Sequence, residues 1–251
     1  LALPMAAHAS SVVRPAAAPP AFPTIAILCY HDVTPENGRP LQDVSPEFLR
    51  DQIRMCRAQG WAFMRLSELV ARREFPEALP PRVMVLTFDD GYRSFQEHVL
   101  PILRQEGVPA TLAPITSYVG AEHPELHPLL SWDELRSVER SGIIDIASHS
   151  HALHQYEWSN PQHDSGPAGT TRRWLTEANR YEDREQYRDR IGADFTASQR
   201  TLKTELRHPV NVLVWPYGCH NDMARAQAEL AGFPITLALE GRAVTAQDLK
   251  R

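Results

Sequence analysis

Cysteine is scarce in this sequence, which contains only Cys29, Cys56 and Cys219 among 251 residues. Three thiols cannot all pair, and none belongs to a Cys-X-X-Cys motif, which argues against a disulfide scaffold and a cysteine-based zinc site. Cys29 lies in an apolar run and Cys56 on the apolar face of a predicted helix, so we interpret both as buried thiols. An exported protein could form one disulfide, and the sequence does not choose the pair.

Positive charge is not in excess, and long hydrophobic runs are absent. The formal net charge of -5 and the pI of about 6.1 argue against nucleic acid as a partner and favour a neutral or weakly cationic substrate. No apolar run is long enough to cross a bilayer, so we expect no transmembrane segment. Hydrophobic residues make up 43% of the chain, enough for the core of one barrel-sized domain.

The N-terminal residues differ from the rest of the chain in composition. Residues 1–9 resemble the tail of a signal peptide, and Ala7-His8-Ala9 fits its cleavage site. Residues 10–23 are rich in alanine and proline, as is typical of a linker. We therefore predict a signal-peptide remnant or disordered leader over residues 1–22, one folded domain over residues 23–251, and a periplasmic or secreted location.

Short apolar runs alternate with helical patterns along nearly the whole chain. Such alternation predicts the α/β class, with a parallel sheet covered by helices. About seven strands in this length favour a distorted or incomplete (β/α) barrel over an open sheet. The predicted strands are residues 25–30, 62–65, 83–88, 110–115, 143–147, 211–215 and 235–239.

Several predicted helices begin at a residue suited to capping the first turn. These cap or start residues are Ser45, Ser67, Ser131 and Asn221. Residues 159–171, rich in glycine, proline, serine and threonine, predict a long loop above the strand ends. Residues 174–206 are strongly charged and predict a long amphipathic helix lying across the barrel. Its apolar face would carry Tyr181, Tyr187, Ile191, Phe195 and Leu202.

Chemically suggestive residues follow several predicted strands at the point where each strand ends. The carboxyl ends of parallel strands meet at one edge of a barrel, where barrel enzymes build their sites. We therefore expect these residues to lie close together. They are His31 after the first strand, Asp89 and Asp90 after the third, His149 after the fifth and residues 215–217 after the sixth.

Asp89 and Asp90 form an adjacent pair of carboxylates at the end of an apolar strand. Two such charges repel each other and lose solvation unless a cation or a proton shares the site. A turn at Asp-Asp-Gly, or capping of a helix that begins near Tyr92, would also explain the pair. Together with the downstream histidines, the better interpretation is one aspartate as metal ligand and the other as base.

Three histidines lie within six residues, directly after a predicted strand. Imidazoles at this spacing converge on one ion, and one carboxylate with two imidazoles makes an open metal site. The pairs His149 with His154, His149 with His151 and His151 with His154 all remain open on spacing alone. The pattern predicts a metal-dependent hydrolase.

Further residues at strand ends are candidates for proton transfer and substrate contact. His31 could be paired with Asp32 in a turn, but its position favours a general acid that protonates an amine leaving group. Trp215 and Tyr217 could pack in the core, or form the wall on which a sugar ring stacks. We expect Tyr92 to contact substrate as well.

The run from Thr87 to Gly91 and the downstream histidines resemble the carbohydrate esterase family 4 polysaccharide deacetylases, the NodB homology domain. The resemblance spans about residues 25–239. It implies that Asp89 is the base, that Asp90, His149 and His154 hold the ion, and that the backbone N–H of Tyr217 stabilises the oxyanion. The histidine spacing is one residue longer than is usual in the family.

Other departures narrow the resemblance. The arginine that usually precedes the family's Pro-Tyr pair is absent from residues 214–217. The family's C-terminal histidine is replaced by His31 near the N-terminus, which implies a circularly permuted barrel. These features resemble the periplasmic deacetylases of poly-β-1,6-N-acetyl-D-glucosamine, many of which carry a second, glycoside-hydrolase-like domain.

The resemblance implies removal of N-acetyl groups from poly-β-1,6-N-acetyl-D-glucosamine, a biofilm exopolysaccharide, with contact to export machinery as a further expectation. It implies one divalent ion, and two imidazoles with a carboxylate suit zinc, nickel, cobalt or iron. The alternatives are deacetylation of chitin, peptidoglycan or xylan, and a catalytically inactive polysaccharide-binding module. An iron oxygenase is a third alternative, but it would leave Asp89 without a role.

Overall fold

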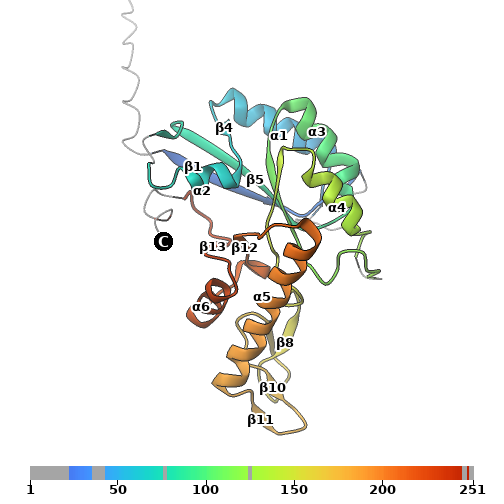
Figure 1. Ribbon diagram of the computed structural model, residues 1–251, viewed down its shortest axis with the longest axis vertical. Helices are drawn as coiled ribbons and strands as arrows, with labels where there is room; N and C mark the ends of the chain where they lie inside the picture. Colours follow the sequence, from blue (N-terminus) through green and yellow to red (C-terminus); the bar gives the residue numbers. More distant parts are fainter. Residues whose placement is uncertain (1–22, 36–42, 76–77, 124–125, 245–247, 249–251) are drawn as a thin grey trace, which may run out of the picture.

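The computed structural model describes residues 23–35, 43–75, 78–123, 126–244 and 248. The predicted leader, residues 1–22, lies outside them. The central feature is a five-stranded parallel sheet in which β1 pairs along β5, while β4 pairs with the first half of β5 and β6 with its last half (Figure 1). Its strands are β1 (Thr24–Tyr30), β4 (Ala62–Phe63), β5 (Arg82–Asp90), β6 (Ala110–Pro114) and β7 (Ile144–Ile146).

The last two predicted strands form a separate parallel pair, β12 (Val212–Val214) and β13 (Ile235–Leu237). A parallel bridge between Ser148 and Leu213 joins this pair to the chain directly after β7. All seven predicted strands are therefore present and pair in parallel, which confirms the α/β class. Closure of a barrel and the permuted strand order stay predictions.

Strand β5 is buried on both faces, which explains why its sequence is a continuous apolar run rather than an alternating one. Met84, Leu86 and Phe88 pack into the main core with helices α1 (Pro46–Ala58) and α3 (Leu100–Glu106). The intervening residues Val83 and Val85 pack on the other face, in a second cluster that also contains Ile25, Met64 and Leu66. The strand end is thus held between two packed layers.

Three predicted helix starts are confirmed by their caps. The Ser45 hydroxyl caps α1, Ser131 and Glu134 form a capping box on α4 (Trp132–Glu139), and Asn221 caps α6 (Asp222–Leu230). The prediction for Ser67 is off by two residues: α2 (Leu66–Ala71) has Arg65 at its cap, and the Ser67 N–H donates to Asp145. None of the helices in the described part of the chain has the length and apolar character needed to cross a membrane.

The predicted helix over residues 174–206 begins later than the sequence indicated. Helix α5 spans Arg184–Leu206, because Asp183 and Gln186 form a capping box that sets its start. The preceding residues instead make an antiparallel hairpin of β10 (Trp174–Leu175) and β11 (Arg180–Tyr181), at the far end of α5 from the sheet (Figure 1). Tyr181 is therefore not on the buried helix face, whereas Tyr187, Ile191, Phe195 and Leu202 are buried there as predicted.

The predicted loop over residues 159–171 also contains regular structure. Strand β9 (Ser165–Pro167) pairs antiparallel with β8 (Tyr156–Trp158). This hairpin directly follows residues 149–154, which contain three histidines and are called the histidine segment below. The exposed side chains of the hairpin therefore lie close to the candidate metal ligands.

Candidate metal centre

Asp89 and Asp90 are the last two residues of β5, and both are buried, with exposed fractions of 4% and 6%. Neighbouring side chains of a strand normally point to opposite faces. Asp90 adopts a left-handed backbone with φ of 68°, which breaks this alternation at the strand end. Gly91 follows with φ of 87°, and a Cβ there would lie 2.9 Å from Pro114 Cβ, so the tight turn requires glycine.

Asp90, His149 and His154 converge on one point. The Oδ1 atom of Asp90 lies 3.6 Å from Nε2 of His149 and 3.5 Å from Nε2 of His154. These distances are longer than good hydrogen bonds, and Asp90 Oδ1 is buried without a hydrogen-bond partner. Because a buried lone oxygen is costly and the donors are those that divalent transition metals prefer, the three residues fit a metal ion.

The orientation of His149 is determined by a hydrogen bond on its far side. Its Nδ1 lies 2.9 Å from the carbonyl oxygen of Val214, which can only accept, so Nδ1 carries the proton and Nε2 keeps a lone pair. Burial lowers the pKa of the His149 imidazole to about 4, although the charge of Asp90 acts in the opposite direction. Burial also lowers the pKa of His154. Both imidazoles are therefore neutral near pH 7, the form that binds metal.

The histidine segment is held by Asp194 of helix α5, which no sequence pattern had indicated. Its two carboxylate oxygens accept hydrogen bonds from the backbone N–H groups of His151 and Ala152, at 2.9 and 2.7 Å. Ser150, at the start of this segment, has a left-handed backbone with φ of 69°. His151 turns away from the group and contacts Thr116, so the pair that converges with Asp90 is His149 and His154.

Asp89 lies beside this group but does not belong to it. Its Oδ2 accepts a hydrogen bond from the thiol of Cys29 at 3.2 Å, and its Oδ1 is buried without a hydrogen-bond partner. Burial first, and then the charge of Asp90, raise the pKa of Asp89 to about 8. The sequence predicts only a buried thiol at Cys29. The structure instead directs it at the predicted base.

His31 approaches Asp89 from the end of β1. One ligand atom each from Cys29, His31 and Asp89 lie within 4.8 Å of one another. Asp32, the next residue, is buried and contacts Ser94 and His127. These contacts anchor the chain immediately after His31.

Tyr217 reaches the metal ligands through its ring. It has a left-handed backbone with φ of 58°, and its ring stacks on that of His154 at a centroid distance of 4.5 Å. Strained backbone of this kind is concentrated at functional sites. Tyr156 of β8 follows, with its ring centroid 4.8 Å from that of Tyr217 and 56% of the residue exposed. Sequence reasoning missed Tyr156, although its position two residues after His154 was a usable clue.

Trp215, predicted to form a sugar-stacking wall with Tyr217, and Tyr92, predicted to contact substrate, are both buried, so neither ring offers an exposed surface to a sugar. Each is only 2% exposed. The Trp215 ring packs edge-on against Phe195 of α5, so it belongs to the core. The backbone of Tyr92 bridges to Leu129, which covers the turn after β5. An aromatic residue at a strand end can pack in the core or contact a ligand. Its tertiary surroundings determine which of the two it does.

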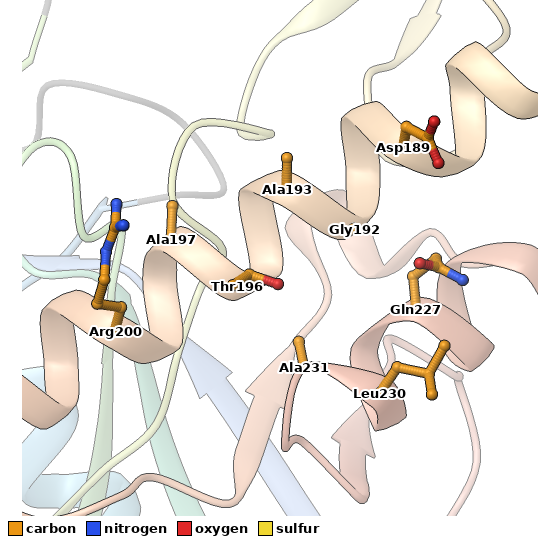
Figure 2. Close-up of a pocket in the computed structure, with 9 residues that line it drawn as sticks. All are labelled: Asp189, Gly192, Ala193, Thr196, Ala197, Arg200, Gln227, Leu230 and Ala231. Carbon is orange, nitrogen blue, oxygen red and sulfur yellow. The ribbon is translucent and has the colours of Figure 1, made fainter.

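A surface groove lies away from these residues, between helices α5 and α6 (Figure 2). It is lined by small or apolar residues such as Ala193, Ala197 and Leu230, together with the polar residues Asp189, Arg200 and Gln227. None of the predicted site residues lines it. The groove therefore has no part in the metal centre.

A parallel α/β sheet that carries two histidines and an aspartate at its carboxyl edge, beside a separate buried carboxylate, has the arrangement expected of metal-dependent hydrolases, a class of enzymes that activate water. The sequence comparison specifies the family within that class. The profile of the polysaccharide deacetylase family matches residues 77–236, and the chain belongs to this family.

Individual relatives agree with this assignment. The chain is 30% identical over 233 residues to the poly-β-1,6-N-acetyl-D-glucosamine N-deacetylase of Escherichia coli strain K12, covering 88% of this chain and 35% of that protein. A solved de-N-acetylase from Aggregatibacter actinomycetemcomitans superposes with a TM-score of 0.80 at 27% identity, covering 87% and 89% of the two chains. The BpsB deacetylase domain from Bordetella bronchiseptica superposes with a TM-score of 0.78 at 29% identity, covering 89% of this chain and 91% of that domain. The chain thus spans about a third of the Escherichia coli relative.

Proposed function

We propose that this protein is a metal-dependent N-deacetylase of poly-β-1,6-N-acetyl-D-glucosamine, located in the periplasm or secreted. The observation that carries the proposal is that the two adjacent aspartates at the end of β5 have different neighbours. Asp90 converges with His149 and His154, whereas the adjacent Asp89 stays outside that group with a buried, unpartnered oxygen. The curated relative from Escherichia coli, which carries this activity in its name, supports the choice of polymer.

In this proposal Asp90, His149 and His154 hold one divalent ion, with zinc, nickel and cobalt as the candidates. When bound, such an ion lowers the pKa of a water molecule and polarises the acetyl carbonyl. The neutral imidazoles and the buried Asp90 carboxylate suit this role, because no proton has to be displaced from the histidines.

Asp89 acts as the general base. Its Oδ2 is engaged by the Cys29 thiol, which leaves Oδ1 to take a proton from the attacking water. A cation beside Asp90 favours the ionised form of Asp89 and so counteracts the burial that raises its pKa. The backbone N–H of Tyr217, at its left-handed turn, is the proposed donor to the developing oxyanion.

His31 acts as the general acid. Cleavage of the amide bond leaves acetate on one side and the glucosamine nitrogen on the other, and that nitrogen needs a proton to depart. His31 lies close to Asp89 and near enough to His149 and His154 for its charge to lower the pKa of both. The reaction consumes one water molecule and releases acetate and the free amine, so its atoms balance.

The aromatic rings beside the centre would contact the sugar. Tyr217 and Tyr156 form a row that leads outward from His154, and both rings offer apolar faces to a neutral pyranose. Trp158 lies on the same face of β8 and is 49% exposed, so it would extend the row. In this proposal these rings replace the buried Trp215 and Tyr92 as substrate contacts.

The same proposal includes the form of the barrel and a contact with a partner. An incomplete barrel in permuted order is supported by the bridge from Ser148 to Leu213 and by an antiparallel bridge from Val244 back to Ile25 on β1. Contact with polymer-export machinery would follow from the use of the partly deacetylated polymer outside the cell.

The test is acetate release by the purified chain from oligomers of β-1,6-linked N-acetylglucosamine, after chelation and after readdition of zinc, nickel or cobalt. Chitin oligomers, peptidoglycan and acetylxylan serve as competing substrates. We expect release from the β-1,6 oligomers that is lost with chelator and restored by metal. Faster release from another polymer would change the substrate. No release from any polymer, with polymer binding retained, would indicate a binding module.

A further inference from the structure

A second group of metal-binding atoms lies beside the first. The Sγ of Cys29, a ring nitrogen of His31 and a carboxylate oxygen of Asp89 lie within 4.8 Å of one another. Within this group the Cys29 thiol already touches Oδ2 of Asp89 at 3.2 Å. Cys29 and His31 come from the end of β1 and Asp89 from the end of β5, which pair in register at that point.

The donor set has the chemistry of a zinc ligand set. A thiolate, an imidazole and a carboxylate are the three side-chain groups that bind zinc, and three protein ligands with one open position make a complete site. Asp89 contributes an oxygen that is buried without a hydrogen-bond partner, an unsatisfied acceptor that a cation would satisfy. Cys29 and His31 are each partly exposed, so an ion can reach them from solvent.

We propose that Cys29, His31 and Asp89 form a second, weaker site for zinc and similar thiophilic divalent ions, and that occupation of this site inhibits the enzyme. An ion bound there takes both the proposed base and the proposed acid out of proton transfer. Binding converts the Cys29 thiol to a thiolate and releases its proton to solvent. The site is weaker than the first because its ion lies close to the charge of an ion held by Asp90.

The inhibitory consequence rests on the proposed deacetylation, but the binding of two ions does not. The deciding experiment is therefore a Co²⁺ titration of the metal-free protein, followed by absorption spectroscopy and equilibrium dialysis. We expect two equivalents to bind. The second should produce the near-ultraviolet charge-transfer band of a cobalt thiolate, whereas the first produces only ligand-field bands of oxygen and nitrogen ligands.

Two variants assign the band to this site. Cys29→Ser should bind one equivalent of cobalt and lose the charge-transfer band. Cys219→Ser is the matched control, because Cys219 is the other partly exposed thiol, and it should keep both the band and the second equivalent. Should Cys29→Ser fold poorly, His31→Gln should weaken the second equivalent by at least about tenfold while the first stays bound. A single equivalent without a thiolate band in the wild-type protein overturns the proposal, as does a band that survives in Cys29→Ser.

Inhibition is measured with acetate release as the readout. Each protein is loaded with one equivalent of cobalt, and zinc is then added, with activity expressed relative to its own starting rate. We expect the half-inhibiting zinc concentration to rise at least about tenfold in Cys29→Ser. Two bound equivalents without any acetate release would leave the second site standing and reject the proposed function. Equal zinc sensitivity of both proteins would reject the inhibitory role.

Discussion

The Nδ1–H of His149 donates to the carbonyl oxygen of Val214 over 2.9 Å, which joins the segment after β7 to strand β12. This bond orients the ring so that Nε2 faces Asp90. The hydrogen bond to a backbone carbonyl also keeps the lone pair on the nitrogen that faces Asp90. The position of this candidate metal ligand therefore depends on how the strands are arranged. Single substitutions can test the role of each residue in the candidate centre separately.

Asp89 and Asp90 should respond differently to the same conservative change. Asp90→Asn should lower metal affinity by more than about 100-fold, because it removes a direct ligand. Asp89→Asn should retain the metal and lower kcat by about 10²- to 10⁴-fold, because it removes the proton acceptor. Metal content by elemental analysis and acetate release test both. Equal metal content together with full activity in the two variants would contradict the assignment.

His31→Gln should lose turnover and keep the ion at the first site. We expect a fall in kcat of about 10²- to 10⁴-fold, since the amine nitrogen would leave without an enzymatic proton donor. Metal content at one equivalent and acetate release are the measurements. His208→Gln provides the control, because His208 is exposed, contacts Glu139 rather than the centre and should keep most of the activity. Wild-type turnover in His31→Gln would assign His31 a structural role.

Asp194→Asn should weaken metal binding without touching a ligand. The change removes one of the two acceptor oxygens that hold the backbone of His151 and Ala152, so the histidine segment loses its alignment. We expect metal affinity to fall by about 10- to 100-fold. Asp189→Asn lies on the same helix, is exposed and serves as the matched control. Unchanged affinity in Asp194→Asn, measured by competition with a chelating dye, would rule out the positioning role.

Tyr156→Ala should weaken substrate binding more than it slows turnover. The ring is 56% exposed and stands next to Tyr217, so its removal takes away a stacking surface and leaves the metal centre intact. We expect KM for β-1,6 oligomers to rise about two- to tenfold with kcat nearly unchanged. Tyr181→Ala, an exposed tyrosine on the β10–β11 hairpin, is the control. A larger effect of the control than of Tyr156→Ala would place the sugar elsewhere.

The stability of the metal-free protein should depend on pH through Asp89. The pKa of Asp89 is raised from its ordinary value of 3.8 to about 8 in the folded protein, so folding favours the protonated form. The stabilisation is fully present below the ordinary value and is lost as pH rises through about 8. Asp89→Asn carries a neutral amide at every pH and lacks this loss.

The measurement is urea unfolding of both proteins with chelator, at about pH 5.5, 7 and 8.5. We expect Asp89→Asn to gain stability relative to the wild-type protein as pH rises. Titration of His149, whose pKa is lowered to about 4, destabilises both proteins as pH falls from 6.5 and cancels in the comparison. A difference between the two proteins that stays constant with pH would contradict the raised pKa.

Much of the fold could be predicted from local patterns. The seven parallel strands and the caps at Ser45, Ser131 and Asn221 depend on residues close in sequence, so the patterns carried enough information. The start of helix α5 was missed, because the spacing of Tyr181 suits a helix although the capping box at Asp183 begins the helix later. Residues 174–181 can form either a helix or a hairpin by local preference. In the structure they form the β10–β11 hairpin, and α5 starts after it at the Asp183 cap.

The aspartate pair, the histidine cluster and the strand-end position of His31 were all determined by the sequence itself, because carboxyl ends of parallel strands must meet. Spacing alone left open which histidines converge and which aspartate stays outside the group. The family resemblance implied Asp90, His149 and His154, and only the tertiary structure shows these three side chains together. The same holds for the burial of Trp215 and for the contacts of Asp194 and Cys29. A side chain's direction depends on backbone twist and on neighbours brought in from distant segments, and periodicity along one strand contains neither.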